Sequence, residues 1–272
     1  MTRLDIAIST YGPEGLARIV QQQLPHIGGV RYIVSWQEHK DAPIPEVLAS
    51  RSDIFIDRFG IAGQSHNRNN ALDHCSADLV LIADDDVHYS EAGIRQALAY
   101  MKKHSDTAIF SFIVERPGAP AYPAEETALS RHYPKNYHIG GCELAMRRSK
   151  AGNLRFHPDF GLNSPDMHGG EDELFHLTAM RRGLECRFAP IVIGSHPHGH
   201  TGFGKPLTPA TLRAQGCISA LMYPRSFAPR LILKAFRLRK NRQSTILRSL
   251  RYMGAGAFRA FRLLRTDRSR LW

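Results

Sequence analysis

Three consecutive aspartates, Asp84 to Asp86, end an apolar stretch that reads ADLVLIA. Alternate side chains of an extended segment face the same way, so we expect Asp84 and Asp86 to project together and Asp85 to project oppositely. Two carboxylates at the mouth of a sheet form half of a site for Mg²⁺ or Mn²⁺, whose other ligands are waters and phosphate oxygens. The alternative is a polar turn before the next helix, although Ser90 already offers a helix cap there.

A second acidic pair, Glu171 and Asp172, follows two glycines in the stretch GGEDELF. Glycines permit a sharp turn or a close approach of the backbone to a ligand. One carboxylate could act as a general base while the other binds hydroxyl groups. Acidic residues also suit the first turn of any helix because of the macrodipole, so an ordinary helix start is the alternative.

Histidines alternate in the stretch SHPHGHTG, where they occupy positions 196, 198 and 200. A neutral imidazole can complete a metal shell that otherwise consists of oxygen atoms. Spacing alone does not make this a zinc site, because no Cys or Glu accompanies the histidines. The residues alone leave two interpretations open, a set of metal ligands and a polar loop that binds nothing.

The hydrophobic pattern around these residues alternates between strands and helices. Strands are expected at residues 3–10, 30–36, 52–59, 77–83, 107–114, 139–149 and 184–194, and helices at 13–24, 65–75, 90–104 and from 171 onward. This alternation predicts an α/β fold whose central sheet is mostly parallel and flanked by helices. Ligands bind beyond the carboxyl ends of such strands, where the aspartates and the stretch STYGPEG would lie.

The net charge of +11 over 272 residues is concentrated at one end of the chain. Residues 221–272 hold 14 Lys and Arg residues and one acidic residue, Asp267, whereas the remainder holds 22 basic and 24 acidic residues. This asymmetry predicts a near-neutral domain at residues 1–215 and a basic helical tail at 216–272.

The compartment is predicted from cysteines and from apolar runs. Four cysteines at wide spacing make no disulfide framework and indicate reduced thiols. No apolar run approaches the ~18 residues that span a bilayer, and the first residues lack the features of a signal peptide. We therefore expect a cytoplasmic protein whose membrane contact, if any, is peripheral and on the inner face.

In their order along the chain, these motifs resemble those of family-2 glycosyltransferases, inverting enzymes of the GT-A fold that use nucleotide sugars. The matching stretches are ISTYGPEGL at 8–16, GQSHNRNNAL at 63–72, LIADDDV at 81–87 and HPDFGLNSPDMHGGEDELFHLTAMRRG at 157–183. The element GGEDE also resembles the Gly-Gly-Glu-Asp-Asp element of β-1,4-galactosyltransferases. Within this resemblance, Asp172 is the expected catalytic base and Glu171 binds the acceptor.

The resemblance also implies a donor site and a cofactor. The nucleotide sugar, expected to be a UDP-sugar, would contact Thr10, Tyr11, Arg68 and Asp84. Asp86 would ligate a divalent metal, Mn²⁺ or Mg²⁺, with His196 or His198 as a further ligand. Such enzymes transfer the sugar to a glycan or a lipid-linked acceptor by a single inverting displacement.

The chain departs from this family after the second expected strand. Many members carry an acidic Asp-Asp-Gly-Ser element there, whereas this chain reads VSWQEHK. Trp36 could stack on a sugar of the acceptor or on a base, and Gln37 could hydrogen-bond one. Two other functions stay open, a nucleotidyltransferase of related fold and a non-catalytic protein that acts through its tail by binding a membrane or a nucleic acid.

Part of the tail has an apolar stripe at helical spacing, flanked by arginines. The stripe comprises Ile246, Leu250, Met253, Ala257, Phe261 and Leu264. Such a helix suits the surface of an anionic membrane, and the alternative is a helix that packs its stripe on the rest of the protein. Nucleic-acid binding ranks below both because no nucleic-acid module accompanies the tail.

Overall fold

The structure is a computed structural model that describes residues 3–118, 121–130, 133, 137, 139–196 and 206–266. The chain divides into two compact units. The sheet unit comprises Met1–Ala62, His66–Arg155 and Ala179–Gly199, and the helical unit comprises Gly63–Ser65, Phe156–Thr178 and His200–Trp272. The expected boundary at residue 215 instead falls inside a helix, and the segment with Glu171 and Asp172 groups with the C-terminal helices.

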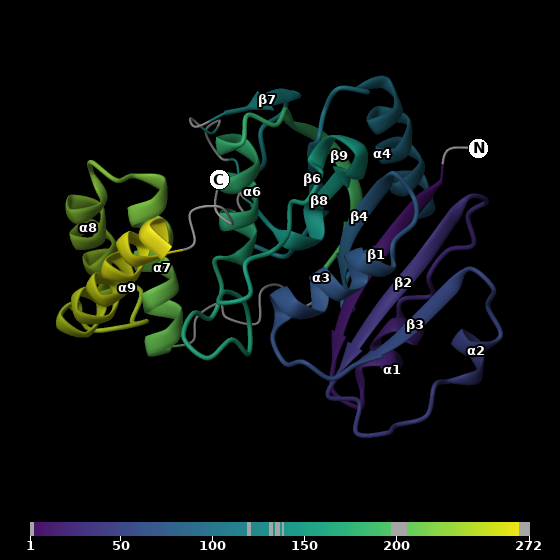
Figure 1. Cartoon of the computed structure of the whole chain (residues 1–272), viewed down its shortest axis with the longest axis horizontal. Coiled ribbons are helices and arrows are strands. Elements are labelled where there is room, and N and C mark those ends of the chain that lie inside the picture. Colours follow the sequence, from purple (N-terminus) through teal and green to yellow (C-terminus); the bar gives the residue numbers. More distant parts are fainter. Residues whose placement is uncertain are drawn as a thin grey trace. The chain divides into compact units, whose positions relative to one another are not determined.

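The sheet unit is built on one mixed sheet in the order β3-β2-β1-β4-β8-β6-β9-β5, with β7 beside β9 (Figure 1). The strands are β1 (Leu4–Tyr11), β2 (Val30–Gln37), β3 (Ile54–Phe59), β4 (Leu79–Asp84), β5 (His88–Tyr89), β6 (Ile109–Glu115), β7 (Thr127–Leu129), β8 (Leu144–Arg147) and β9 (Cys186–Ser195). The first four strands are parallel to one another, as is β6 to β9. Strand β8 runs antiparallel to both β4 and β6, which makes the sheet less uniformly parallel than expected.

Helices interrupt the strands as the alternating pattern predicts. They are α1 (Gly15–Gln21), α2 (Glu46–Ala49), α3 (Gln64–His74), α4 (Glu91–Lys103), α5 (Arg148–Ala151), α6 (Glu171–Arg181), α7 (Pro209–Met222), α8 (Phe227–Lys240) and α9 (Ile246–Thr266), with a 3₁₀ turn at Gly141–Glu143. Ser90 caps α4 as expected, since its hydroxyl accepts a hydrogen bond from the Gly93 amide at 3.0 Å. None of these helices, within the described ranges, is long and apolar enough to cross a bilayer.

The core of the sheet unit consists of the apolar strands that the sequence marks as covered on both faces. Ile6 and Ile8 of β1 and Leu81 of β4 are buried and belong to one hydrophobic cluster. All four cysteines are buried and none of them forms a disulfide, so the expectation of reduced thiols stays a prediction that this structure is compatible with. This core holds the strands in place, and the polar residues lie at the ends of the strands.

The strand register brings several carboxyl ends to one edge of the sheet. Tyr11 pairs with Gln37, and Ser9 pairs with Asp84, so β1, β2 and β4 end together. Farther along the sheet, Glu115 of β6 pairs with Ser195 of β9. Because β8 is antiparallel to both of its neighbours, β4 and β6 run the same way and end at the same edge. This edge is where ligands bind in open α/β sheets.

The helical unit is held by a close crossing of α7 and α9. A Cβ atom on Gly216 of α7 would lie 1.9 Å from the Met253 carbonyl oxygen, and one on Gly256 of α9 would lie 1.9 Å from the Arg213 carbonyl oxygen. The two glycines therefore let the helix backbones touch. The buried face of α9 consists of Ser249, Met253, Gly256, Ala257, Ala260 and Leu263.

This packing revises the expected use of the apolar stripe on α9. Met253 and Ala257, two members of that stripe, are buried, whereas Phe261 is exposed. The buried face of α9 therefore only partly coincides with the predicted stripe, and it includes the small residues Ser249, Gly256 and Ala260. The sequence pattern located an amphipathic helix but not which neighbour covers its apolar face.

Candidate functional site

The three aspartates point to three different partners at the end of β4. The strand ends at Asp84, and Asp85 and Asp86 lie in the turn that follows, so the expected alternation stops there. Asp84 pairs with Arg68, Asp85 with Arg18, and Asp86 with His196. Asp84 and Asp86 therefore do not share a partner, and the turn rather than the strand pleat sets their directions.

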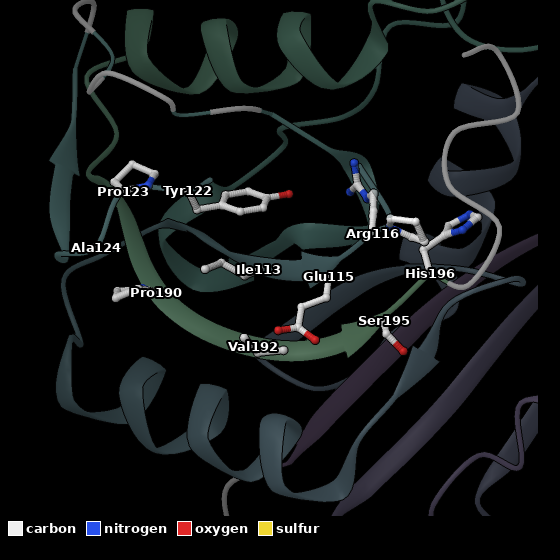
Figure 2. A pocket seen from close by; sticks show the side chains of 11 residues that line it. Ile113, Glu115, Arg116, Tyr122, Pro123, Ala124, Pro190, Val192, Ser195 and His196 are labelled. Atoms are coloured by element: carbon white, nitrogen blue, oxygen red, sulfur yellow. The ribbon is translucent and has the colours of Figure 1, made fainter. Parts of the chain in front are cut away.

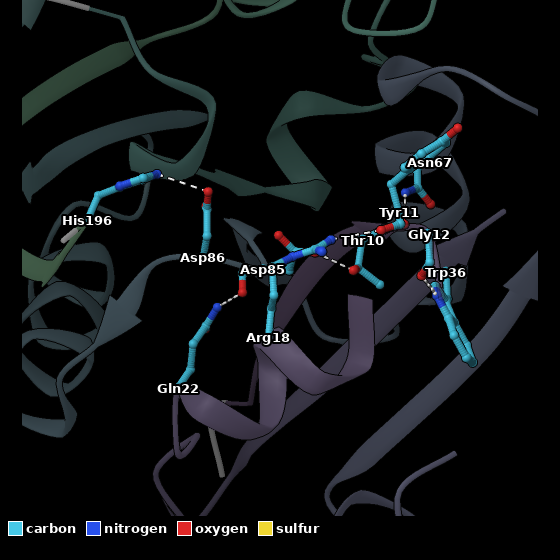
Figure 3. Close-up of polar contacts among 10 residues, drawn as sticks. All are labelled: Thr10, Tyr11, Gly12, Arg18, Gln22, Trp36, Asn67, Asp85, Asp86 and His196. Atoms are coloured by element: carbon cyan, nitrogen blue, oxygen red, sulfur yellow. Dashed lines mark hydrogen bonds and ion pairs between the residues drawn. The ribbon is translucent and has the colours of Figure 1, made fainter. Parts of the chain in front are cut away.

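Asp85 holds the turn in place rather than facing a ligand. Its carboxylate accepts hydrogen bonds from the Arg18 guanidinium, at 2.6 Å from Nη2, and from the Thr10 hydroxyl (Figure 3). The Gln22 side chain donates to the Asp85 carbonyl oxygen. Burial raises the pKa of Asp85, although the hydrogen bonds from Arg18 and Thr10 oppose that shift. The expectation that Asp85 is structural agrees with these contacts.

Asp84 faces a buried guanidinium on α3. Nη2 of Arg68 lies 3.1 Å from Oδ1 of Asp84, and the Arg68 side chain is almost fully buried while Asp84 is partly exposed. Gly141 makes room for this arginine, because a Cβ atom there would lie 2.4 Å from Nη2 of Arg68. The expected proximity of Arg68 to the aspartates is therefore present within the sheet unit.

Asp86 lies beside His196, which follows the last residue of β9. Nε2 of His196 is 3.1 Å from Oδ2 of Asp86, and Figure 3 shows the two side chains directed at each other. Nδ1 of His196 is buried and has no hydrogen-bond partner in the described part of the chain. His198, the other expected ligand, lies outside the described residues.

The donor set at Asp86 and His196 fits a divalent cation as a half-site. Across the described ranges, no group of three or more His, Cys, Asp and Glu side chains is close enough to hold a metal. One carboxylate oxygen and one imidazole nitrogen nonetheless suit Mn²⁺, and such ions commonly complete their shell with water and substrate phosphates. These two residues would hold the ion only together with a phosphate-bearing substrate.

The two residues after the first strand have different roles. The Thr10 side chain is buried and committed to Asp85, and the Thr10 carbonyl accepts a hydrogen bond from Asn67 at 2.8 Å. Thr10 therefore positions the turn, which corrects its expected place in the lining of a pocket. Tyr11 is 46% exposed at the end of β1 and is free to line a nucleotide site.

Trp36 contradicts its expected role, because its ring has no exposed face. The residue is 0% exposed, and its indole Nε1 donates to the Gly12 carbonyl oxygen at 2.7 Å. The Arg58 guanidinium carbon lies 5.1 Å from the ring centroid. A Cβ atom on Gly15 would lie 3.1 Å from Nε1. Trp36 thus packs under the first glycine-containing loop and cannot stack on a sugar.

In the helical unit, Glu171 and Asp172 occupy the first turn of α6, as expected. Gly169 and Gly170 precede them with φ angles of +97° and +85°, a region that disfavours any side chain. A Cβ atom on Gly170 would also lie 2.8 Å from Ile218 of α7. Glu171 is buried and Asp172 is half-buried. The Gly-Gly pair therefore sets the start of α6 against α7.

One charged cluster of the sheet unit was not anticipated. Glu143 is completely buried and accepts a hydrogen bond from Arg116 at 2.5 Å and another from the Tyr122 hydroxyl. Burial, followed by the charge of Glu143, raises the pKa of Tyr122. A lone carboxylate inside the apolar stretch CELAM is the sequence signal that could have indicated this cluster.

Comparisons with known proteins agree with this architecture. The model of the family described as glycosyl transferase family 2 matches residues 38–176, about half of the chain. No curated protein matches the chain.

Solved structures share the fold at low identity. The crystal structure of S. aureus TarS 1–349 in complex with UDP-GlcNAc is 14% identical, with a TM-score of 0.60 over 91% of this chain and 75% of that one. The mannosyltransferase PcManGT from Pyrobaculum calidifontis, in complex with GDP-Man and Mn²⁺, is 14% identical, with a TM-score of 0.54 over 98% of this chain and 79% of that one. Given the family match, the fold and the acidic edge of the sheet, this chain belongs to glycosyl transferase family 2.

Proposed function

We propose that this glycosyltransferase moves a sugar from a nucleotide diphosphate sugar, with a UDP-sugar as the expected donor, to a glycan or lipid-linked acceptor. The observation that carries the proposal is the pair of contacts at the end of β4, Arg68 with Asp84 and His196 with Asp86. A diphosphate group is a poor leaving group until its charge is compensated. Support comes from the similar proteins whose structures contain UDP-GlcNAc or GDP-Man.

The sheet unit would bind the donor at this edge. Tyr11 is exposed at the end of β1, and Asp84 is partly exposed, so both can meet the nucleotide sugar. Arg68 orients the Asp84 carboxylate through a charge-assisted hydrogen bond. Mn²⁺ or Mg²⁺, when held by Asp86 and His196, would neutralise charge that develops on the departing diphosphate.

The acidic start of α6 would act on the acceptor. Asp172 is the proposed base, because a carboxylate can remove the proton from an acceptor hydroxyl as that oxygen attacks the anomeric carbon. Glu171 is proposed to bind the acceptor. Attack opposite the leaving diphosphate in one step inverts the anomeric configuration. This assignment depends on the sequence resemblance around the Gly-Gly-Glu-Asp motif.

The experiment that tests this function is a panel of nucleotide sugars in thermal-shift measurements with and without Mn²⁺. A true donor at a hundredfold excess over its Kd adds about 2.7 kcal/mol of stability, which raises the melting temperature by a few degrees. We expect the rise only when metal is present, and only for the wild type and not for Asp86→Asn. A panel in which no nucleotide sugar shifts the melting temperature would contradict the proposal.

The proposed base has its own test in the same assay system. Asp172→Asn should keep the donor Kd within about twofold of wild type and slow sugar transfer about a thousandfold, which is typical for loss of a general base. Asp166→Asn, which neutralises an exposed carboxylate of the helical unit, is the matched control. Transfer by Asp172→Asn within tenfold of wild type would show that another group accepts the proton.

A nucleotidyltransferase also uses carboxylates at a sheet edge, and the family match favours the glycosyltransferase. The assays separate the two, because a nucleotidyltransferase releases pyrophosphate whereas a glycosyltransferase releases a nucleoside diphosphate. Detection of pyrophosphate as the product would favour the nucleotidyltransferase over the glycosyltransferase.

Helix α8 supports a proposal that the basic tail contacts an anionic membrane surface. Ile232, Leu233 and Phe236 share one face of α8 and are 47%, 67% and 56% exposed. Basic residues flank this face at Arg230, Arg237, Arg239 and Lys240. No acidic residue occurs between positions 206 and 266, so anionic headgroups would meet no like charge from this segment. The opposite face of α8 is buried, which leaves this one to the membrane.

Liposome co-sedimentation tests the membrane proposal. Wild-type protein should bind vesicles that contain phosphatidylglycerol and not vesicles of phosphatidylcholine alone, and added salt should weaken binding. Leu233→Ser with Phe236→Ser should reduce binding at least tenfold, whereas Val47→Ser, an exposed apolar position on α2, should not. Equal binding by the double variant and wild type would exclude α8 as the contact.

A further inference from the structure

The sheet unit contains a hollow of about 680 Å³ at the carboxyl ends of β6 and β9. Its volume is in the range of small-molecule binding sites. Figure 2 shows the side chains that line it, which come from β6, from the segment after β6, and from β9 with the residue that follows. None of the contacts discussed so far fills this space.

Most of the wall is apolar. Ile113 of β6, Val192 of β9 and the prolines Pro123 and Pro190 form much of it, together with the ring of Tyr122. The Tyr122 hydroxyl donates to the buried Glu143 carboxylate, so this hydrogen bond already engages the polar end of the side chain. A ligand therefore meets carbon surface over most of the hollow, which suits the C–H faces of a sugar ring or another neutral group.

The charges at the hollow disfavour an anion. Arg116 is paired with the buried Glu143 at 2.5 Å, so its positive charge is already compensated. Glu115 is exposed at the end of β6, and its carboxylate lies inside the hollow beside Val192 (Figure 2). A phosphate group placed there would be repelled by Glu115, whereas a hydroxyl could donate a hydrogen bond to it.

The hollow adjoins the proposed reaction site through His196. This side chain lines the hollow and also lies 3.1 Å from Asp86. A ligand in the hollow can therefore present a hydroxyl next to the Asp86–His196 pair, where the donor diphosphate is proposed to bind.

We infer that this hollow binds the acceptor, and that the accepting unit is a neutral sugar ring rather than a phosphate-bearing group. The inference rests on the proposed function and narrows it, because a lipid phosphate would have its charge opposed by Glu115. The nucleotide sugar occupies the edge at Asp84 and Asp86, and its diphosphate stays outside the hollow.

The test uses octyl β-glycosides and the corresponding sugar 1-phosphates as probes, with saturation-transfer NMR on the full chain in the absence of donor. At least one neutral glycoside should bind wild type, and the 1-phosphates should bind at least tenfold more weakly. Val192→Trp fills the hollow from a partly exposed position and should lower the ratio of glycoside affinity to UDP-sugar affinity at least tenfold. Val47→Trp, which adds the same ring at an exposed position on α2, should leave that ratio unchanged.

Glu115→Gln tests the charge directly, because it should narrow the difference between glycosides and 1-phosphates at least threefold. Three results would overturn the inference. In the first, wild type binds no glycoside. In the second, wild type binds glycosides and 1-phosphates equally well. In the third, Val192→Trp loses affinity for the UDP-sugar but keeps its affinity for the glycoside. Glycoside binding without any binding or turnover of nucleotide sugars would instead refute the proposed function and leave the sugar site standing.

Discussion

The guanidinium of Arg68 lies 3.1 Å from the carboxylate of Asp84 and packs against Gly141, whose missing side chain makes room for it. The arginine belongs to α3 and the aspartate ends β4, so the contact joins two elements at the ligand-binding edge. Since the arginine is almost fully buried, its position depends on its packing partners as well as on its charge. Gly141 is the partner that can be altered without touching either charge.

Gly141→Ala should displace Arg68 from Asp84 and weaken donor binding. The added Cβ would lie 2.4 Å from Nη2 of Arg68, so the guanidinium must move. We expect the donor Kd to rise about tenfold and stability to fall by about 1–3 kcal/mol, as for overpacked sites. Isothermal titration with the UDP-sugar identified by the panel measures the first effect. Gly28→Ala, at a position where a Cβ meets nothing within 4 Å, should match wild type.

The pairing of Asp86 with His196 predicts how metal affinity responds to substitution. His196→Gln and Asp86→Asn should each weaken Mn²⁺ binding at least tenfold in the presence of UDP, because each removes one of two protein ligands. Electron paramagnetic resonance of free Mn²⁺ measures this affinity without requiring turnover. His88→Gln changes an exposed histidine on the neighbouring strand β5 and is the control. Unchanged Mn²⁺ affinity in both site variants would place the ion elsewhere.

The sequence predicts the order of strands and helices well because burial of β1 and β4 on both faces leaves a continuous apolar run. It also identifies the aspartates at the end of β4, since a charge run cannot continue inside such a strand. The direction of β8 is not predictable from its residues, because antiparallel and parallel pairing bury the same apolar side chains.

Trp36 shows why single side chains are harder to assign than elements. The residue is next to last in the apolar strand β2, and only the pairing of β1 with β2 and the loop at Gly12 reveal that its ring is covered. Strand alternation predicts that Asp85 points away from Asp84 and Asp86. It does not predict that Arg18 and Thr10 hold the Asp85 carboxylate in place. Long-range partners of this kind leave no mark in the local sequence.

The crossing of α7 and α9 predicts opposite effects for two glycines two residues apart. Gly256→Ala should destabilise the helical unit by more than 1 kcal/mol, because its Cβ would lie 1.9 Å from the Arg213 carbonyl oxygen. Gly254→Ala meets nothing within 4 Å and should stabilise α9 by about 0.5–1 kcal/mol, the gain expected within a helix. Thermal unfolding together with hydrogen exchange in α7 and α9 measures both. Equal effects of the two variants would mean that the helices do not touch at this point.

Buried His176 on α6 predicts that stability falls in mild acid. Burial lowers the pKa of His176 to about 4, against 6.5 in an exposed chain, so the folded protein binds its proton less tightly than the unfolded chain. The stability present above about pH 6.5 is therefore lost as the pH falls toward 4, by about 3 kcal/mol from this residue.

His176→Gln removes that titration and should flatten the dependence of stability on pH. The free energy of unfolding, measured with urea at a series of pH values, should therefore fall less between pH 7 and pH 4 for His176→Gln than for wild type. The carboxylates titrate in both proteins, so their contributions cancel when the two stability curves are subtracted. His88→Gln, which alters an exposed ring, should follow the wild-type curve. If wild type and His176→Gln lose stability in parallel, His176 is not the group that senses the acid, and its ring must reach solvent in the folded protein.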